Sequence, residues 1–219
     1  MIQGYFFDMD GVLYDSMPNH ARVWEEVMTR HHLHFSVHDC YVNEGRTGFD
    51  VIHEAILTEE GREATRDEIN RIYSEKTAAF QACGKALPIR GIVPVLDYLH
   101  QHNKTIWIVT GSGQDSLFDT LNSDFPHIFD RERMITAFDV THGKPHPEPY
   151  LKAWERSGLR KDECCVIENA PLGIRAAKSA GLFTIGVNTG VLTPQDLRDA
   201  GADIVFDNME QLLVYFQSL

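Results

Sequence analysis

The chain has 219 residues, of which 43% are hydrophobic and 24% are charged, and it carries a formal net charge of −12. These proportions are ordinary for a globular protein with an apolar core, and the negative charge argues against non-specific nucleic-acid binding, which needs a basic face. A small anionic ligand is not excluded, because a few cations can reverse the field inside a pocket.

The first element expected along the chain is a short buried strand from Ile2 to Phe7, which leads directly into Asp8 and Asp10. Gly11 marks the turn out of that strand. Side chains two residues apart on extended backbone point the same way, so the two carboxylates should converge on one spot. Close carboxylates repel each other, and a divalent cation relieves that repulsion. Alone, such a pair is more often a solvated turn, so its interpretation depends on the other polar segments of the chain.

The next part of the chain has helical periodicity and no convincing strand. The stretches with this pattern are Ala21 to His32, Asp50 to Leu57 and Arg66 to Cys83. We therefore expect a helical insertion over residues 16–87, between the first strand and the rest of a core made of residues 1–15 and 88–219. Proline and glycine punctuate both boundaries, and two neighbouring linkers would form a hinge that lets the insertion act as a lid.

From about Gly91 onward, apolar runs of strand length alternate with helical patterns. This alternation predicts an α/β fold with a doubly wound, Rossmann-like parallel sheet as the core and an all-helical cap inserted into it. Ligands in such folds bind at the carboxyl ends of the strands. The expected strands are Thr105–Val109, Cys164–Ile167, Phe183–Val187 and Ile204–Phe206, and the expected helices are Gln114–Leu121, Leu172–Ala180 and Glu210–Phe216.

The second strand ends in a turn of hydroxyl and small residues, Thr110, Gly111, Ser112 and Gly113. Backbone amides and the hydroxyls of Thr110 and Ser112 are suited to hold phosphate oxygens. The alternative is that Ser112 only caps the following helix.

Two later segments also carry polar groups at the sheet edge. Lys144 is held between Gly143 and Pro145, and a stiffly held lysine neutralises phosphate charge at little entropic cost. The strand that begins at Cys164 ends on Glu168 and Asn169, whose oxygens suit Mg²⁺.

Taken together, these segments resemble the haloacid dehalogenase superfamily of phosphotransferases across the whole core. The features that carry the resemblance are the DMDGVLYDS start, the VTGS turn, the GKPHP lysine and the ENAPLGIRAAKSAG helix entry. The helical insertion directly after the first motif resembles the β-phosphoglucomutase-like branch of that superfamily, which has a helical cap.

The resemblance implies a role for each motif residue. Asp8 would attack phosphorus and become a transient aspartyl phosphate, and Asp10 would protonate the leaving group and then deprotonate the incoming water or alcohol. Thr110, the Gly111 amide and Lys144 would bind the oxygens of the transferred phosphoryl group. An anionic nucleophile approaches phosphate only where cations first neutralise the charge.

The resemblance also implies Mg²⁺ as the cofactor, held by the Asp8 carboxylate, the Asp10 carbonyl and Asn169, with Glu168 in support. The family often has an acid at the position of Asn169. A neutral amide lowers the ligand charge and should weaken metal binding somewhat, but we expect an active enzyme because the other motifs are intact.

Cap residues select the substrate in this branch, which draws attention to Glu44 and Arg46 in the segment NEGRTG. Arg46 could grip a second phosphate, Glu44 could close over the site or join the metal, and Lys76 and His20 are further candidates to face the core. For Lys76 alone, a solvated helix charge is the more common role. NEGRTG with ENAPLG looks most like a bacterial inorganic pyrophosphatase of this superfamily, so we expect pyrophosphate or another small phosphorylated metabolite as substrate.

Two alternatives stay open. The chain could be a β-phosphoglucomutase or a sugar-phosphate phosphatase, and a mutase would isomerise its substrate without net phosphate release. It could also be an inactive member that only binds phosphorylated metabolites.

The spacing of the cysteines and histidines in the sequence does not indicate a zinc site. Cys40, Cys83, Cys164 and Cys165 lack CxxC spacing, which predicts reduced thiols. The cluster from His31 to His34 has no partner pair and is expected to be a hydrated helix end. With no basic start, no signal peptide and no apolar run of about 18 residues, we expect a cytoplasmic monomer that binds neither membrane nor nucleic acid.

Overall fold

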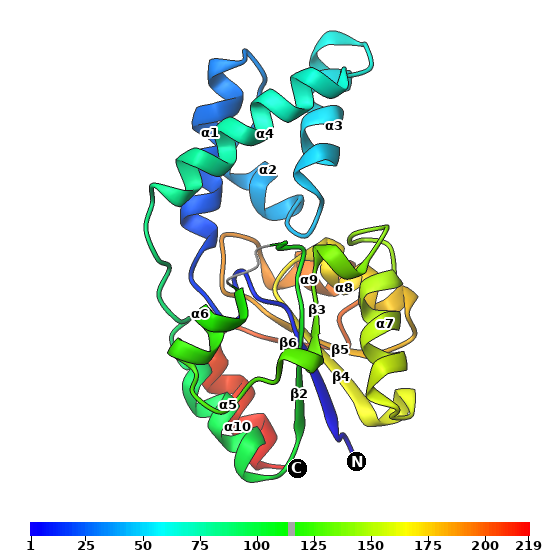
Figure 1. The fold of residues 1–219 in the computed structure, drawn as a ribbon. Helices are drawn as coiled ribbons and strands as arrows, with labels where there is room; N and C mark the ends of the chain where they lie inside the picture. The colour runs from blue at the N-terminus through cyan, green and yellow to red at the C-terminus, as the bar shows by residue number, and fades with distance from the viewer. Residues whose placement is uncertain (114–116) are drawn as a thin grey trace.

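The core is a parallel six-stranded sheet with the order β3-β2-β1-β4-β5-β6 (Figure 1). A computed structural model describes residues 1–113 and 117–219. The order is that of a doubly wound sheet, so the predicted fold class is confirmed. The strands are β1 (Gly4–Phe7), β2 (Thr105–Val109), β3 (Met134–Ile135), β4 (Cys164–Glu168), β5 (Phe183–Val187) and β6 (Ile204–Phe206).

Helices cover both faces of the sheet because alternate strand residues point to opposite sides. Tyr5 and Phe7 belong to one apolar cluster, with side chains of α5, α6 and α10. Phe6, between them, belongs to another with side chains of α7 and α8. The helices of the core are α5 (Ile92–Gln101), α6 (Leu117–Asp124), α7 (Glu148–Ser157), α8 (Pro171–Ser179), α9 (Pro194–Asp199) and α10 (Met209–Gln217), with 3₁₀ turns at Arg131–Arg133, Ala137–Asp139 and Lys161–Glu163.

The insertion over residues 16–87, all of which the structure describes, contains four helices and stands above the sheet in Figure 1. They are α1 (Met17–Arg30), α2 (Val37–Val42), α3 (Gly48–Glu60) and α4 (Arg66–Gln81). Their apolar faces share a cluster that includes Val27, Ile52 and Ile72. Burial of these faces against one another gives the insertion a core of its own.

Several elements differ from the sequence expectations. Helix α1 begins at Met17 rather than Ala21, because Ser16 occupies the N-cap position and Pro18 is tolerated in a first turn. The short helix α2 was not predicted, although Ser36 and Asp39 form a capping box at its start. Helices α5, α7 and α9 and the two-residue strand β3 were also not predicted individually. Of the helix expected over 114–121, residues 114–116 lie outside the described residues, and α6 begins at Leu117.

The two linkers between the insertion and the core lie side by side. The Asp15 amide donates to the Leu87 carbonyl at 2.8 Å, and the Ile89 amide donates to the Leu13 carbonyl at 2.8 Å. The insertion is therefore joined to the core by two adjacent linker segments. Rotation about these segments would move the insertion as a unit. Among the described residues, no helix is both long and apolar enough to cross a membrane.

Candidate active site

Lys144 lies at the centre of a buried ionic cluster at the carboxyl end of the sheet. Its ammonium contacts the Asp8 carboxylate, which follows β1, and donates to Glu168 Oε1 at 2.7 Å and to the Val109 carbonyl at 3.1 Å. Asp8, Lys144 and Glu168 are all buried. Since β1 and β4 are neighbours on either side of the point where strand order reverses, the fold itself brings the two carboxylates to one lysine.

Glu168 is fixed by donors on both of its carboxylate oxygens. Besides Lys144, Oε1 accepts from the Tyr150 hydroxyl at 2.8 Å. Oε2 accepts from the amides of Asn169 at 3.0 Å and Ala170 at 3.2 Å, at the start of α8. A carboxylate held by this many donors positions the lysine firmly.

The close approach of α8 to Glu168 depends on Gly173. A Cβ atom at this position would lie 1.7 Å from Glu168 Oε1, so no side chain fits without movement of the helix or the carboxylate. We expect Gly173→Ala to lower stability by about 2 kcal/mol or more and to reduce activity through a displaced Lys144. Chemical denaturation measures the first effect, and Ser179→Ala, an exposed change in the same helix, is the control. Equal stabilities of the two variants would contradict this packing.

Asp10 faces the cap rather than Lys144. Its Oδ1 accepts from the Ser16 hydroxyl at 2.5 Å and lies 3.6 Å from His20 Nε2. The other ring nitrogen of His20 is 3.0 Å from the Lys76 ammonium. Lys76 is buried and lies over the rings of Trp24 and Phe80, so two predicted cap residues, His20 and Lys76, are joined to Asp10 in one polar chain.

Asn169 lies between the core and the cap. Its Nδ2 donates to both carboxylate oxygens of Glu44, at 3.1 and 2.9 Å. Its Oδ1 is buried and has no hydrogen-bond partner among the described residues. The side chain lies directly over Gly11, where φ is +75° and a Cβ atom would be 2.1 Å from Nδ2. A glycine is therefore required there both by conformation and by contact.

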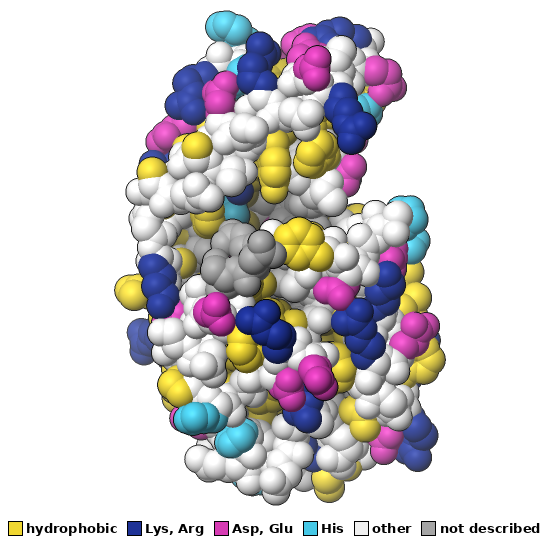
Figure 2. Space-filling model, in the orientation of Figure 1, with side chains coloured by type: hydrophobic (Ala, Val, Ile, Leu, Met, Phe, Trp, Pro, Cys, Tyr) yellow, Lys and Arg dark blue, Asp and Glu magenta, His cyan; other side chains and the backbone are white. Residues whose placement is uncertain are grey.

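The cap loop that contains Glu44 closes onto the phosphate-binding segments predicted from the sequence. A Cβ atom at Gly45 would lie 3.1 Å from the Lys144 side chain, and one at Gly111 would lie 3.8 Å from the Gly45 carbonyl. Arg46, by contrast, turns toward the cap helix α3 and lies 3.6 Å from Glu54. Figure 2 shows the molecular surface hollowed between the cap and the core on one side.

The predicted hydroxyl turn lies at the end of β2. Thr110 is buried, and its hydroxyl accepts from the Ser112 amide at 3.0 Å, which shapes the turn. Ser112 is half-buried, and its carbonyl accepts from the Ala137 amide. The Lys144 ammonium donates to the carbonyl of Val109, the residue before Thr110, so this turn begins beside Lys144, while Ser112 is further along the loop.

The electrostatics of the cluster are dominated by burial. Burial raises the pKa of Asp8 to about 8, against the opposing effect of Lys144. Burial, followed by the charges of Asp8 and Glu168, raises the pKa of Glu44 well above its ordinary value. Burial opposes the charge of Lys144, but Asp8 and Glu168 outweigh it and raise the pKa of the ammonium. For Asp10, His20 and Ser16 overcome burial and lower the pKa.

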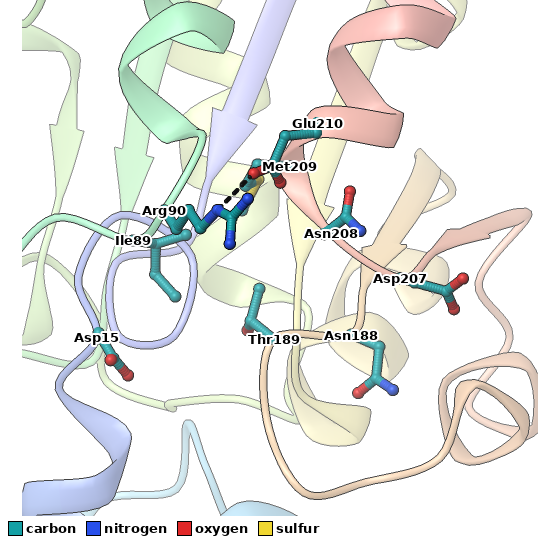
Figure 3. A pocket seen from close by; sticks show the side chains of 9 residues that line it. All are labelled: Asp15, Ile89, Arg90, Asn188, Thr189, Asp207, Asn208, Met209 and Glu210. Carbon is teal, nitrogen blue, oxygen red and sulfur yellow. Dashed lines mark hydrogen bonds and ion pairs between the residues drawn. The ribbon is translucent and has the colours of Figure 1, made fainter.

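A separate hollow of about 530 Å³ lies beside the hinge, and Figure 3 shows the side chains that line it. They include Asp15, Asp207 and Glu210, and Arg90 pairs with Glu210 at 2.9 Å. None of the predicted site residues lines this hollow. Its excess of carboxylates disfavours a phosphate, so we place the candidate active site at the Lys144 cluster.

Three residues that contribute to the site were missed by sequence reasoning. Ser16 binds Asp10, Tyr150 binds Glu168, and Gly173 leaves room for Glu168. The sequence signal for Ser16, an N-cap serine before proline, indicates only a helix start. Tyr150 had no local signal, since its partner is distant in the sequence.

A family model of haloacid dehalogenase-like hydrolases matches residues 2–181. The chain therefore belongs to the haloacid dehalogenase-like hydrolase family, and its structural neighbours include the β-phosphoglucomutase-like branch that the sequence resembles.

Several relatives are similar over most of their length. Glycerol-1-phosphate phosphohydrolase 2 of Saccharomyces cerevisiae is 31% identical, over 97% of this chain and 85% of its own. A fructose-1-phosphate phosphatase of Escherichia coli is 28% identical, over 84% of this chain and 95% of its own. Among solved structures, a protein of Bacteroides vulgatus provisionally described as a β-phosphoglucomutase is 44% identical, with a TM-score of 0.95 over 99% of this chain and 88% of that one.

Proposed function

We propose that the chain is a Mg²⁺-dependent phosphohydrolase that works through an aspartyl phosphate on Asp8. The observation that carries the proposal is that Lys144 contacts both Asp8 and the carbonyl of Val109, directly before Thr110, at one sheet edge, next to an Asp10 that has its own hydrogen-bond partner. The phosphatase relatives support the same reaction class. Four free cysteines, three of them buried, fit a reducing compartment such as the cytoplasm.

The chain's own residues divide the reaction into two steps. An Asp8 oxygen bonds to phosphorus while the bond to the leaving oxygen breaks, and Asp10, in its protonated form, gives that oxygen its proton and becomes the carboxylate that His20 and Ser16 stabilise. Asp10 then takes a proton from water, whose oxygen attacks phosphorus and releases inorganic phosphate and free Asp8. Lys144 and Thr110 hold the phosphoryl oxygens throughout. Ser16 keeps the Asp10 carboxyl in place at 2.5 Å.

The residues at the edge of the sheet fit a magnesium ion. The buried Asn169 Oδ1 accepts no hydrogen bond from the part of the chain that the structure describes, and such buried acceptors are rare unless something binds them. Asp8 and Glu168 also place two buried carboxylates against the ammonium of Lys144, and the buried Glu44 carboxyl adds a third acidic group at Asn169. Asp8, the Asp10 carbonyl and Asn169 would hold the ion, with Glu168 in support. When bound, it would offset the negative charge of the phosphoryl group.

We expect Asn169→Ala to weaken the affinity for Mg²⁺ by about 10- to 100-fold, because it removes a ligand oxygen that no described residue binds. The measurements are the Mg²⁺ concentration at half-maximal activity and calorimetric titration of the protein with Mg²⁺. Asn188→Ala, at the end of the neighbouring strand β5, is the matched control and should bind Mg²⁺ normally. If Asn169→Ala also binds Mg²⁺ normally, the assignment of this ligand is wrong.

For the substrate we propose inorganic pyrophosphate. The cap loop supports a small substrate, since Glu44 reaches Asn169 and Gly45 lies against Lys144. Arg46 is the cation on this loop that could receive a second phosphate, after it leaves Glu54. The Arg46 Nε is buried and bonds to none of the described residues, so its N–H is available as a donor.

A substrate panel tests this proposal. With Mg²⁺ present, kcat/KM for pyrophosphate should exceed that for glycerol 1-phosphate and fructose 1-phosphate by about tenfold or more. Arg46→Ala should lower the pyrophosphate value more than the ester values, whereas Arg62→Ala, an exposed cap arginine paired with Glu68, should change neither. Faster release from the sugar esters would overturn pyrophosphate but leave the Asp8 chemistry in place.

A sugar-phosphate phosphatase is the second candidate, and the similarity to phosphatases of glycerol 1-phosphate and fructose 1-phosphate favours it. A β-phosphoglucomutase would convert glucose phosphate without net phosphate release, so a phosphate assay separates it from both hydrolases. A protein that only binds phosphorylated metabolites would turn over none of the panel.

A further inference from the structure

The loop that carries Lys144 brings together two imidazoles and a carboxylate on the surface of the core. His142, His146 and Glu148 each offer a ligand atom, and these atoms lie within 4.8 Å of one another. Both histidines are exposed and Glu148 is half-buried. Figure 2 shows histidine side chains together at this rim of the core, over the loop that leads into α7 in Figure 1.

The carboxylate of this cluster is already held in place. Glu148 accepts from the amides of Thr141 and His142 at 2.9 Å each, and Lys152 lies 2.9 Å from its Oε1. Groups that bind a ligating carboxylate in this way orient it for a metal.

The imidazoles of His142 and His146 lie close to the Glu148 carboxylate and to each other. His142 Nδ1 is 3.0 Å from Glu148 Oε2, and the rings of His142 and His146 lie 4.6 Å apart. Zinc bonds of about 2.0–2.1 Å in a tetrahedron place two ligand atoms about 3.3 Å apart, so an ion could replace the proton between His142 and Glu148 with little movement. Pro145 and Pro147 restrict the backbone on both sides of His146. If His146 Nδ1 bound the ion, it would give up only the long hydrogen bond that it accepts from the Glu148 amide, at 3.2 Å.

We propose that His142, His146 and Glu148 form a surface site for a divalent transition-metal ion of the Zn²⁺ class, separate from the Mg²⁺ site. Two imidazoles favour zinc, nickel or copper over magnesium, which prefers oxygen. Three protein ligands leave a fourth position for water. The site does not depend on the proposed function. Its ligands lie on both sides of Lys144 in the sequence, so an ion would tie the two ends of this loop together. An ion that binds only the folded chain stabilises the fold.

Zinc titration of the purified protein, with Mg²⁺ at saturation and a chromophoric zinc chelator as competitor, tests the proposal. The wild type should take up Zn²⁺ and show a higher thermal midpoint with it. His142→Ala with His146→Ala should raise the Kd by about tenfold or more and abolish the thermal shift. His100→Ala with His102→Ala, which removes two exposed histidines before β2, is the matched control and should bind as the wild type does.

His142→Gln with His146→Gln removes the same ligands and keeps the loop polar. A thermal midpoint equal to that of the wild type, measured without zinc, shows that the alanine or glutamine variant is folded. Absence of zinc uptake by the wild type would overturn the proposal. Equal zinc affinity in the wild type and the His142/His146 variant would also overturn it. So would an equal loss of zinc affinity in the His142/His146 and His100/His102 variants, because zinc would then bind exposed histidines in general and not a defined site.

Discussion

Replacement of Asp8 by asparagine should reduce phosphate release by about 10⁴-fold or more, which is the scale seen when a covalent nucleophile is lost. The amide has nearly the same shape as the carboxylate, so the contact with Lys144 and the packing against β4 can persist. What disappears is the anionic oxygen that forms the bond to phosphorus. Initial rates of phosphate release at saturating Mg²⁺ measure the effect, first with pyrophosphate as substrate and then, in separate assays, with the sugar phosphates.

Asp97→Asn is the matched control for this prediction, because Asp97 is an exposed carboxylate on α5. It should retain wild-type activity. Thermal unfolding should show that Asp8→Asn is folded, since removal of a charge from a crowded anionic cluster does not expose apolar surface. An active Asp8→Asn enzyme would overturn the aspartyl-phosphate mechanism, and an inactive wild type on every substrate would favour a binding protein.

Replacement of Lys144 by methionine should damage both stability and catalysis. The ammonium separates Asp8 from Glu168 in the buried interior. Without it these carboxylates lose their shared counter-charge, and loss of one partner of a buried ion pair costs about 3–5 kcal/mol. For a chain of this length the midpoint of thermal unfolding should fall by about 10 °C. The rate should fall by about 10²- to 10³-fold, as when one donor to a transition-state oxygen is removed.

Lys152→Met provides the control for that change. Lys152 also pairs with an acid on the same part of the chain, Glu148, but at the surface. Exposed pairs contribute less than about 1 kcal/mol, so this variant should unfold near the wild-type temperature. Denaturation without Mg²⁺ separates the structural effect of Lys144 from its part in catalysis. Equal stability of the two variants would show that the buried cluster does not need its lysine.

Much of the fold could be predicted from local pattern. β2, β5 and β6 lie at the predicted residues, because short apolar runs between turn residues are typical of buried parallel strands. The elements that were missed are short or carry few local signals. Strand β3 has two residues, Met134 and Ile135, and exists only because β2 offers an edge on which to pair. No window of sequence that short separates a strand from a loop.

The candidate site was predictable as a set of residues but not as a set of contacts. Sequence order placed Asp8, Thr110 and Lys144 at strand ends or the loops beside them, and a parallel sheet gathers such ends at one edge. Which acid Lys144 would bind could not be predicted, nor that Tyr150 would support Glu168. Such choices depend on side-chain directions and packing between residues far apart in the chain.

The sequence by itself therefore determined the α/β core with a helical insertion, because these depend on residue type and short-range spacing. Its resemblance to the family also indicated the residues that we propose for phosphoryl transfer. The tertiary structure decided how these residues are paired. Asp10 turns to Ser16, Arg46 turns to Glu54, and Glu44 crosses to Asn169, 125 positions along the chain. The physical reason is that buried polar groups must find partners in three dimensions, and the available partners are known only once the cap has packed over the sheet.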